Sequence, residues 1–185
     1  MSSSVLAAPA SPVPSSTEST RRQLSARQAA TVQRLTVRNV ARTAGVAPAT
    51  AYTYFTSREH LVTEVFWRRL EALPETRVDR RRSTAARVGA AMSDFALLVA
   101  DEPELAAACT VAMLATDPDV KLLRDRIGLE WRRRLAAALG DDAAPEVLAT
   151  LEFVISGALL QAGMGHMTYQ ELPGHLTRAV ELVVE

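Results

Sequence analysis

Hydroxyl and guanidinium side chains are concentrated between residues 36 and 61, in the run TVRNVARTAGVAPATAYTYFTSREHL. Thr50 and Thr53 can contact a base edge or a thymine methyl, whereas the hydroxyls of Tyr52 and Tyr54 are better placed for phosphates. Three cations in the same run could neutralise a phosphate backbone: Arg38, Arg42 and Arg58. This combination of side chains suits the surface of double-stranded DNA.

Other reactive side chains do not form a recognisable catalytic or metal-binding pattern. Cys109 is the single cysteine, and we expect it to be a small buried hydrophobic residue rather than a nucleophile. His166, Glu171 and His175 are five and four residues apart across a Pro-Gly pair, which favours loop histidines over a metal site. No paired base and nucleophile is present, so we expect neither an enzyme nor a cofactor.

The formal net charge is zero, with 21 basic and 21 acidic residues, but the charge is divided along the chain. Residues 21–69 hold nine Arg against two Glu, a difference of +7, and residues 94–185 hold seven basic and fifteen acidic residues, a difference of −8. Any attraction to DNA must therefore come from about 50 residues at one end.

Two short helices are expected to carry the polar side chains of residues 36–61. Thr36 can cap a helix that runs through Ala44 and ends at Gly45. Pro48 suits the first turn of a second helix, which extends to about Phe55. A glycine turn between two short helices is typical of a helix-turn-helix, whose second helix lies in the major groove of DNA.

The rest of the chain predicts further helices and no strands. Helices are expected at about 57–73, 84–100, 103–115, 118–139, 144–165 and 174–184, and a less regular first helix lies within 15–35. The fold class is therefore all-α, with about nine helices. We expect a disordered tail (1–14), a DNA-binding domain (15–60) and a second helical domain (61–185). No stretch approaches the roughly 18 apolar residues that span a bilayer, and with one cysteine a cytoplasmic protein is expected.

The ordered pattern TVxxVAxxAGVAxxTxYxYFxSRExL resembles the N-terminal signature of the TetR family of bacterial one-component regulators. The resemblance implies a three-helix DNA-binding domain followed by a helical domain for ligand binding and dimerisation. It implies that Thr36, Tyr52 and Arg58 contact phosphates and that Thr50 and Thr53 belong to the recognition helix. The full set of expected DNA-contacting residues is Thr36, Arg38, Ala47, Ala49, Thr50, Tyr52, Thr53, Tyr54 and Arg58.

In such a protein the large apolar side chains of the second domain would surround a pocket for a hydrophobic effector. The pocket residues expected on this basis are Phe66, Trp67, Leu70, Met92, Phe95, Cys109, Met113, Trp131 and Phe153. For any one of these residues ordinary core packing is the favoured explanation, and only the resemblance supports the pocket.

The last two helices look like a pair that associates with its copy in a four-helix bundle. The residues expected at this dimer interface are Leu151, Ile155, Leu159, Leu176, Val180 and Val183. A buried hairpin within a monomer is the alternative interpretation.

The leading hypothesis is a homodimeric repressor that binds a palindromic operator and is released by a hydrophobic small molecule. The alternative is a helical dimeric ligand-binding or protein-interaction protein with weak or no DNA binding. This alternative rests on the first helix, where Arg27, Gln28 and Thr31 stand in a region that carries bulky apolar residues in the family.

Overall fold

The computed structural model describes residues 35–76 and 79–184. Over these ranges the chain forms only helices, which confirms the all-α prediction. The α-helices are α2 (Val37–Thr43), α3 (Pro48–Tyr54), α4 (Arg58–Ala72), α5 (Thr84–Ala96), α6 (Pro103–Met113), α7 (Pro118–Leu139), α8 (Pro145–Gly163) and α9 (Leu172–Val184). The expected tail and first helix lie outside the described residues.

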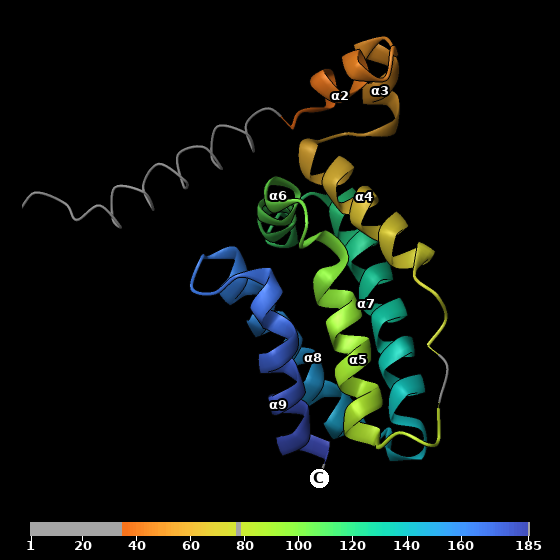
Figure 1. Ribbon diagram of the computed structural model, residues 1–185. Coiled ribbons are helices and arrows are strands. Elements are labelled where there is room, and N and C mark those ends of the chain that lie inside the picture. Colours follow the sequence, from red (N-terminus) through yellow and green to blue (C-terminus); the bar gives the residue numbers. More distant parts are fainter. Residues whose placement is uncertain (1–34, 77–78, 185) are drawn as a thin grey trace, which may run out of the picture.

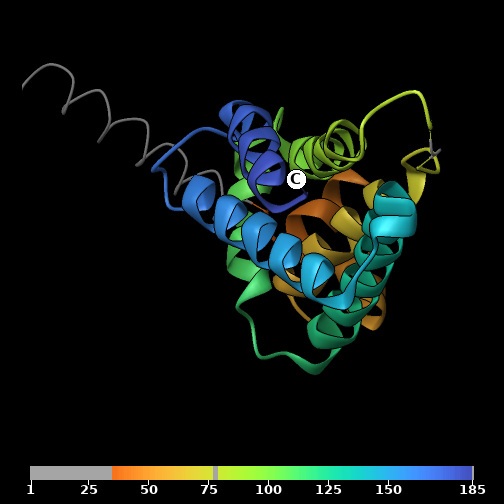
Figure 2. The ribbon, with the colours of Figure 1, turned by 90° about the horizontal axis from the view of Figure 1, so that it is seen from below.

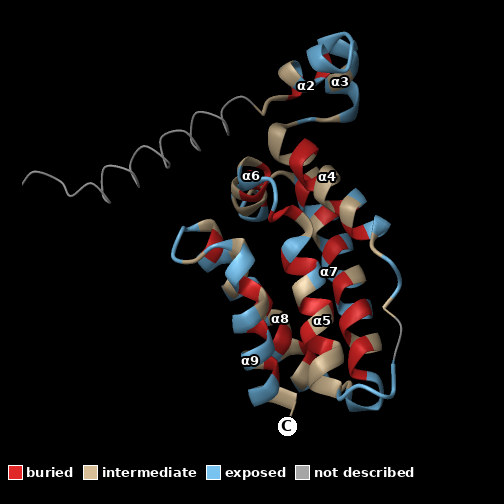
Figure 3. Cartoon of the chain, viewed as in Figure 1, coloured by how far each residue is buried: buried red, intermediate tan, exposed pale blue. Residues whose placement is uncertain are grey.

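Helices α2 and α3 form one end of the molecule, and α4 leads from them into a larger helical body (Figure 1). In that body α5 packs against α7 and α9, and α4 packs against α6 and α7. Helices α8 and α9 lie side by side, as the view from below also shows (Figure 2). The buried residues lie on the inward sides of these helices (Figure 3), and the fully buried side chains include Leu70, Met92, Leu135, Leu151 and Leu176.

The start of α9 differs from the expected position. The pair Pro173-Gly174 was predicted to separate two helices, but α9 begins at Leu172 and contains both residues. Proline is tolerated in the first turn of a helix, because its missing N–H would have no intrahelical partner there. The pair therefore lies inside the first turn instead of ending a loop.

Helix α8 is long and apolar enough to cross a membrane by length and composition alone, over its 19 residues Pro145–Gly163. This finding corrects the expectation that no stretch comes close to a spanning segment. Within this protein, Leu148, Leu151, Ile155 and Ala162 of α8 are buried against the other helices. Both faces of α8 are apolar, so composition does not reveal which face turns inward.

Gly163 allows α8 to approach α6 closely. A Cβ atom at this position would overlap the side chain of Thr110, lying 2.5 Å from Cγ2 and 2.8 Å from Cβ. The Thr110 hydroxyl cannot turn away freely, because it bonds the Ala106 carbonyl at 3.2 Å and the Tyr169 hydroxyl at 3.1 Å.

We expect Gly163→Ala to lower the free energy of unfolding by about 1–3 kcal/mol, the usual cost of inserting a methyl group into a packed contact. Urea denaturation followed by circular dichroism measures the change. Gly128→Ala is the matched control, since a Cβ there meets no atom within 4 Å, and it should gain about 0.5–1 kcal/mol from helix propensity. Equal effects of the two substitutions would contradict the close approach.

Candidate nucleic-acid interface

The turn between α2 and α3 is built by local backbone chemistry. Thr36 caps α2, its Oγ1 accepting from the Asn39 N–H at 3.2 Å. After α2, Gly45 adopts a φ of 69°. The Gly45 N–H donates to the Arg42 carbonyl at 3.3 Å and the Val46 N–H donates to the Ala41 carbonyl at 2.9 Å. This pair of bonds is the Schellman motif, which confirms Gly45 as the left-handed end of the helix.

Helix α3 presents its side chains to solvent, and none of its residues is buried. Pro48 occupies its first turn, as predicted. The Tyr52 and Tyr54 side chains are 52% and 69% exposed, so both can reach a large ligand. Thr53 Oγ1 donates to the Thr50 carbonyl at 2.6 Å, which leaves its methyl group and lone pairs free to face outward. Thr50 is an exposed residue on the same helix.

A groove runs between α2 and the start of α3. It is lined by Arg38, Asn39, Arg42, Val46 and Pro48. Both guanidinium groups belong to exposed residues, so two cations lie beside the start of α3. From sequence Arg42 is only one more cation near α3, whereas in the structure it lines the same groove as Arg38. The groove thus places two cations beside the first turn of α3, whose exposed hydroxyls follow along the same helix, and cations and hydroxyls are the groups that contact DNA phosphates.

Arg58, which was expected to bind a phosphate, is partly buried at the start of α4. It begins α4, directly after Ser57, whose Oγ accepts from the His60 N–H at 3.0 Å. Its side chain is only 23% exposed, and Nη1 lies 3.7 Å from Glu59 Oε1. The Nε and Nη2 atoms are buried without a hydrogen-bond partner among the described residues. Arg58 therefore has one guanidinium edge inside the protein instead of standing free beside α3.

The segment after α3 touches the beginning of α7. Thr56 Oγ1 donates to Asp119 Oδ2 at 2.8 Å, and His60 Nδ1 lies 3.9 Å from the same oxygen. A hydrogen bond from the Ser57 side chain is the main reason that the pKa of the Asp117 carboxyl lies below its usual value. By sequence alone, residues 117–119 are an ordinary helix start, because nothing local to them indicates a distant partner. We call this contact the α4–α7 joint.

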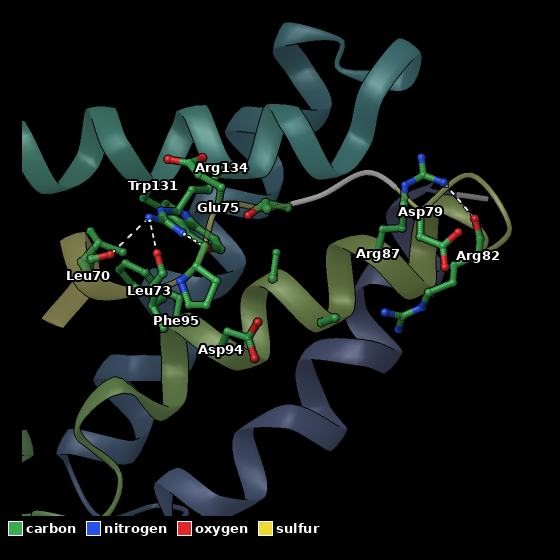
Figure 4. A pocket seen from close by; sticks show the side chains of 14 residues that line it. Leu70, Leu73, Glu75, Asp79, Arg82, Arg87, Asp94, Phe95, Trp131 and Arg134 are labelled. Atoms are coloured by element: carbon green, nitrogen blue, oxygen red, sulfur yellow. Dashed lines mark hydrogen bonds between the residues drawn. The ribbon is translucent and has the colours of Figure 1, made fainter.

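The residues expected to form a pocket separate into three groups. Leu70, Phe95 and Trp131 line a cavity of about 200 Å³ between α4, α5 and α7 (Figure 4). The other core residues are buried elsewhere or half-buried: Phe66, Trp67, Met92 and Cys109. Burial raises the pKa of the Cys109 thiol to about 12, which keeps it protonated.

Two of the expected pocket residues point away from the interior. Met113 is 50% exposed and Phe153 is 80% exposed, so their assignment to the pocket is wrong. Phe153 faces outward because Leu151 and Ile155, two positions before and after it, take the inward side of α8. Residues two apart on a helix are about 200° apart around its axis and cannot share a face.

The residues expected at a dimer interface are largely inside one protomer. Leu151, Ile155, Leu176 and Val180 are at most 2% exposed, and Leu159 and Val183 are half-buried. The first four are enclosed within the protomer, so their assignment to the dimer interface is wrong, whereas that of Leu159 and Val183 stays a prediction. The exposed large apolar side chains of α8 and α9, together with the Met164 that follows α8, are Phe153, Leu160, Met164 and Leu182.

Comparison with known proteins agrees with the helix-turn-helix geometry. The profile of bacterial regulatory proteins of the tetR family matches residues 30–65. HTH-type transcriptional regulators from Mycobacterium bovis and Mycobacterium tuberculosis are 46% identical over 152 residues, covering 81% of this chain and 71% of theirs. The crystal structure of a TetR transcriptional regulator from Rhodococcus sp. RHA1 is similar in fold, with a TM-score of 0.65 and 21% identity over 82% of this chain and 87% of that one.

Proposed function

Because this chain belongs to the TetR family of bacterial transcriptional regulators, with a DNA-binding helix-turn-helix, we propose that it is a homodimeric repressor of a palindromic operator. A small-molecule effector bound in the helical body would release it. The family and the relatives are transcriptional regulators, a non-enzymatic class. A regulator works where the DNA is, so we place the protein in the cytoplasm.

The exposed α3 beside the arginine groove is the observation that carries this proposal. Its hydroxyls would enter the major groove, and Arg38 and Arg42 would hold the flanking phosphates. In the proposed complex Ala47, Ala49 and Thr50 face the bases. A second copy of α3 would lie one helical turn of DNA away, roughly 34–36 Å, and would read the other half of the palindrome.

The exposed side of α8 supports a dimer. Phe153, Leu160 and Met164 follow one another at spacings of seven and four residues, which places them on one side of the helical path. Gly157 lies between them with no atom within 4 Å of a Cβ, so a second helix could approach closely there. Together with Leu182 of α9 these residues form what we call the outer α8 stripe, and a symmetric partner would bury it on both copies.

Helix α7 offers a physical route from an effector to the DNA. It lines the cavity with Trp131 and contacts the helix-turn-helix end through Asp119 in the α4–α7 joint. A ligand that shifts this 22-residue helix would move the α3 helices of the two copies apart. A dimer with the wrong spacing fits only one half-site at a time and leaves the operator. We place the domain boundary near residue 60, inside the continuous α4.

Selection of random DNA duplexes by the purified full-length protein tests the proposed function. A palindrome with half-sites about 10 base pairs apart is the expected product. Failure to enrich any palindrome would overturn the repressor proposal and favour a helical dimer that binds ligands or proteins without tight DNA binding.

Two substitutions on α3 should then behave differently. We expect Thr50→Ala to reduce the discrimination between base pairs at one operator position by about 1–3 kcal/mol, because the hydroxyl contacts a base edge. Tyr52→Phe should weaken binding to the operator and to its single-base variants by the same factor, because a phosphate contact carries no sequence information. Mobility shifts at fixed salt measure both effects. A uniform loss for Thr50→Ala would show that Thr50 does not read a base.

A further inference from the structure

The α4–α7 joint brings two carboxylates to the end of α3. Thr56 and Ser57 lie between α3 and α4, and both carry a hydroxyl. Thr56 Oγ1 donates to Asp119 Oδ2 at 2.8 Å. The Ser57 hydroxyl stabilises the charged form of Asp117, which is the main reason that the pKa of this carboxyl lies below its usual value. The start of α7 therefore holds both hydroxyls through negatively charged groups.

The same two hydroxyls are suited to bind DNA phosphates. Hydroxyls and the N–H groups of the first turn of a helix are common phosphate ligands, and those N–H groups have no partner within the helix. The N-terminal residues of a recognition helix contact the bases, so the residues after its other end approach the phosphates that border the groove. Helix α3 has seven residues, which is about 10 Å in a major groove about 12 Å wide. Thr56 and Ser57 are therefore within reach of a phosphate when α3 occupies the groove.

A phosphate at this position competes with the start of α7. Thr56 has one hydroxyl proton, and Asp119 already accepts it. Ser57 Oγ accepts from the His60 N–H at 3.0 Å, so its own proton is left for an acceptor, and Asp117 is the acceptor beside it. A phosphate oxygen can take either proton only after a carboxylate has given it up.

The two carboxylates also repel a phosphate directly. Among the described residues, neither Asp117 nor Asp119 has an ion pair with an arginine or a lysine, and the basic group beside Asp119 is the His60 ring, at 3.9 Å. The Asp119 side chain is 44% exposed, so its charge acts on the surrounding solution. Exposed charges interact over about 8–10 Å at physiological salt, and a phosphate bound at Thr56 lies within that range.

We propose that the α4–α7 joint is an autoinhibitory contact, in which the carboxylates of Asp117 and Asp119 compete with DNA phosphates for the two hydroxyls. DNA binding opens the joint, and closure of the joint favours release of the DNA. This inference deepens the proposed function, on which it rests for the role of an effector: a ligand that presses the start of α7 against α4 strengthens the contact and weakens DNA binding.

Two substitutions remove the charges and keep the local structure. Asp119→Asn retains an oxygen that can accept from Thr56. Asp117→Asn retains the cap of α7, in which Asp117 Oδ1 accepts from the Asp119 N–H at 2.9 Å, because asparagine caps helices as well as aspartate does. Asp141→Asn is the matched control: it changes the net charge equally by removing an exposed carboxylate just beyond the other end of α7.

Fluorescence anisotropy with a short duplex of arbitrary sequence measures DNA affinity for the full-length protein, at about 50 mM and about 200 mM salt. We expect each asparagine variant at the joint to bind about three- to tenfold more tightly than the wild type at the lower salt, because one repelling charge is gone. The double variant should bind more tightly than either single one. The gain should shrink at the higher salt, where the repulsion is screened, and Asp141→Asn should change the affinity less than about twofold.

Unchanged or weaker binding by both joint variants would overturn the proposal, since the joint would then be neutral or would position α3 for DNA. An equal gain in Asp141→Asn, or no binding of the duplex by any variant, would overturn it as well. The duplex carries no operator, so the result is separate from the selection of a palindrome. Variants that gain affinity in a protein that selects no palindrome refute the repressor and support the contact. A protein that selects a palindrome but shows no gain refutes the contact alone.

Discussion

Phe153→Glu is expected to turn the proposed dimer into a monomer and to abolish operator binding. Phe153 is 80% exposed in the protomer and lies on the outer α8 stripe, so its replacement leaves the protomer core intact. In a two-fold symmetric interface the substitution places two carboxylates among apolar side chains. Losing a central aromatic anchor costs about 2–4 kcal/mol, and the buried charges add to that cost, so dimerisation should weaken at least about 100-fold.

Sedimentation equilibrium measures the dimer affinity and a mobility shift measures operator binding. Leu122→Glu is the matched control, because Leu122 is 69% exposed on α7, outside the proposed interface. It should leave both the dimer and the operator complex unchanged. Circular dichroism should show the same helix content in both variants. A dimeric Phe153→Glu protein would refute the outer α8 stripe as the interface.

The second large effect concerns Arg134, which is 4% exposed. Its guanidinium holds the last turn of α4 through the Leu70 and Leu73 carbonyls, at 3.3 and 3.1 Å. Its Nε donates to Glu130 Oε1 at 2.6 Å. Helix ends leave carbonyls without partners, and a cation there also interacts favourably with the helix dipole. Arg134 therefore joins α7 to the end of α4.

We expect Arg134→Met to lower the free energy of unfolding by about 3–5 kcal/mol, because it leaves buried carbonyls and one carboxylate without this partner. Urea denaturation at neutral pH measures the loss. Arg133→Met is the control: it removes a neighbouring arginine whose side chain is 50% exposed, and exposed ion pairs contribute about 0–1 kcal/mol. A similar loss for both variants would show that the burial of Arg134 does not increase its contribution to stability.

The ion pairs of Glu130 with Arg133 and Arg134 predict the direction in which stability changes with pH. Hydrogen bonds from Arg133 first, and then from Arg134, hold the pKa of Glu130 below its ordinary value of 4.5. A carboxyl whose pKa is lowered in the folded state stabilises the protein above its ordinary pKa. That contribution is lost as the pH falls below 4.5 and Glu130 becomes protonated.

Local chemistry explains why the DNA-binding end could be predicted from sequence. The Thr36 cap, the Gly45 turn and the Pro48 helix start each depend on residues within five positions, and the structure shows all three. Helix α7 likewise runs from Pro118 to Leu139, as expected from the proline before it and the glycine after it. Such signals need no knowledge of distant contacts.

Distant contacts account for what the sequence did not reveal. The α4–α7 joint brings Thr56 to Asp119, 63 positions along the chain, and no pattern near either residue indicates the other. The cavity likewise depends on how α4, α5 and α7 meet. The sequence shows which residues are large and apolar. Only the structure shows which of them line the cavity, which lie in the core and which are exposed.

The sequence by itself determined the all-helical class, the helix-turn-helix and the family, because these follow from local capping, turn chemistry and an ordered motif. Only the tertiary structure decided which side of α8 faces the core. A helix that is apolar on nearly all sides carries no pattern that orients it. Its inward face is set by the neighbours that cover it, and they bury Leu151 and Ile155 and leave Phe153 exposed.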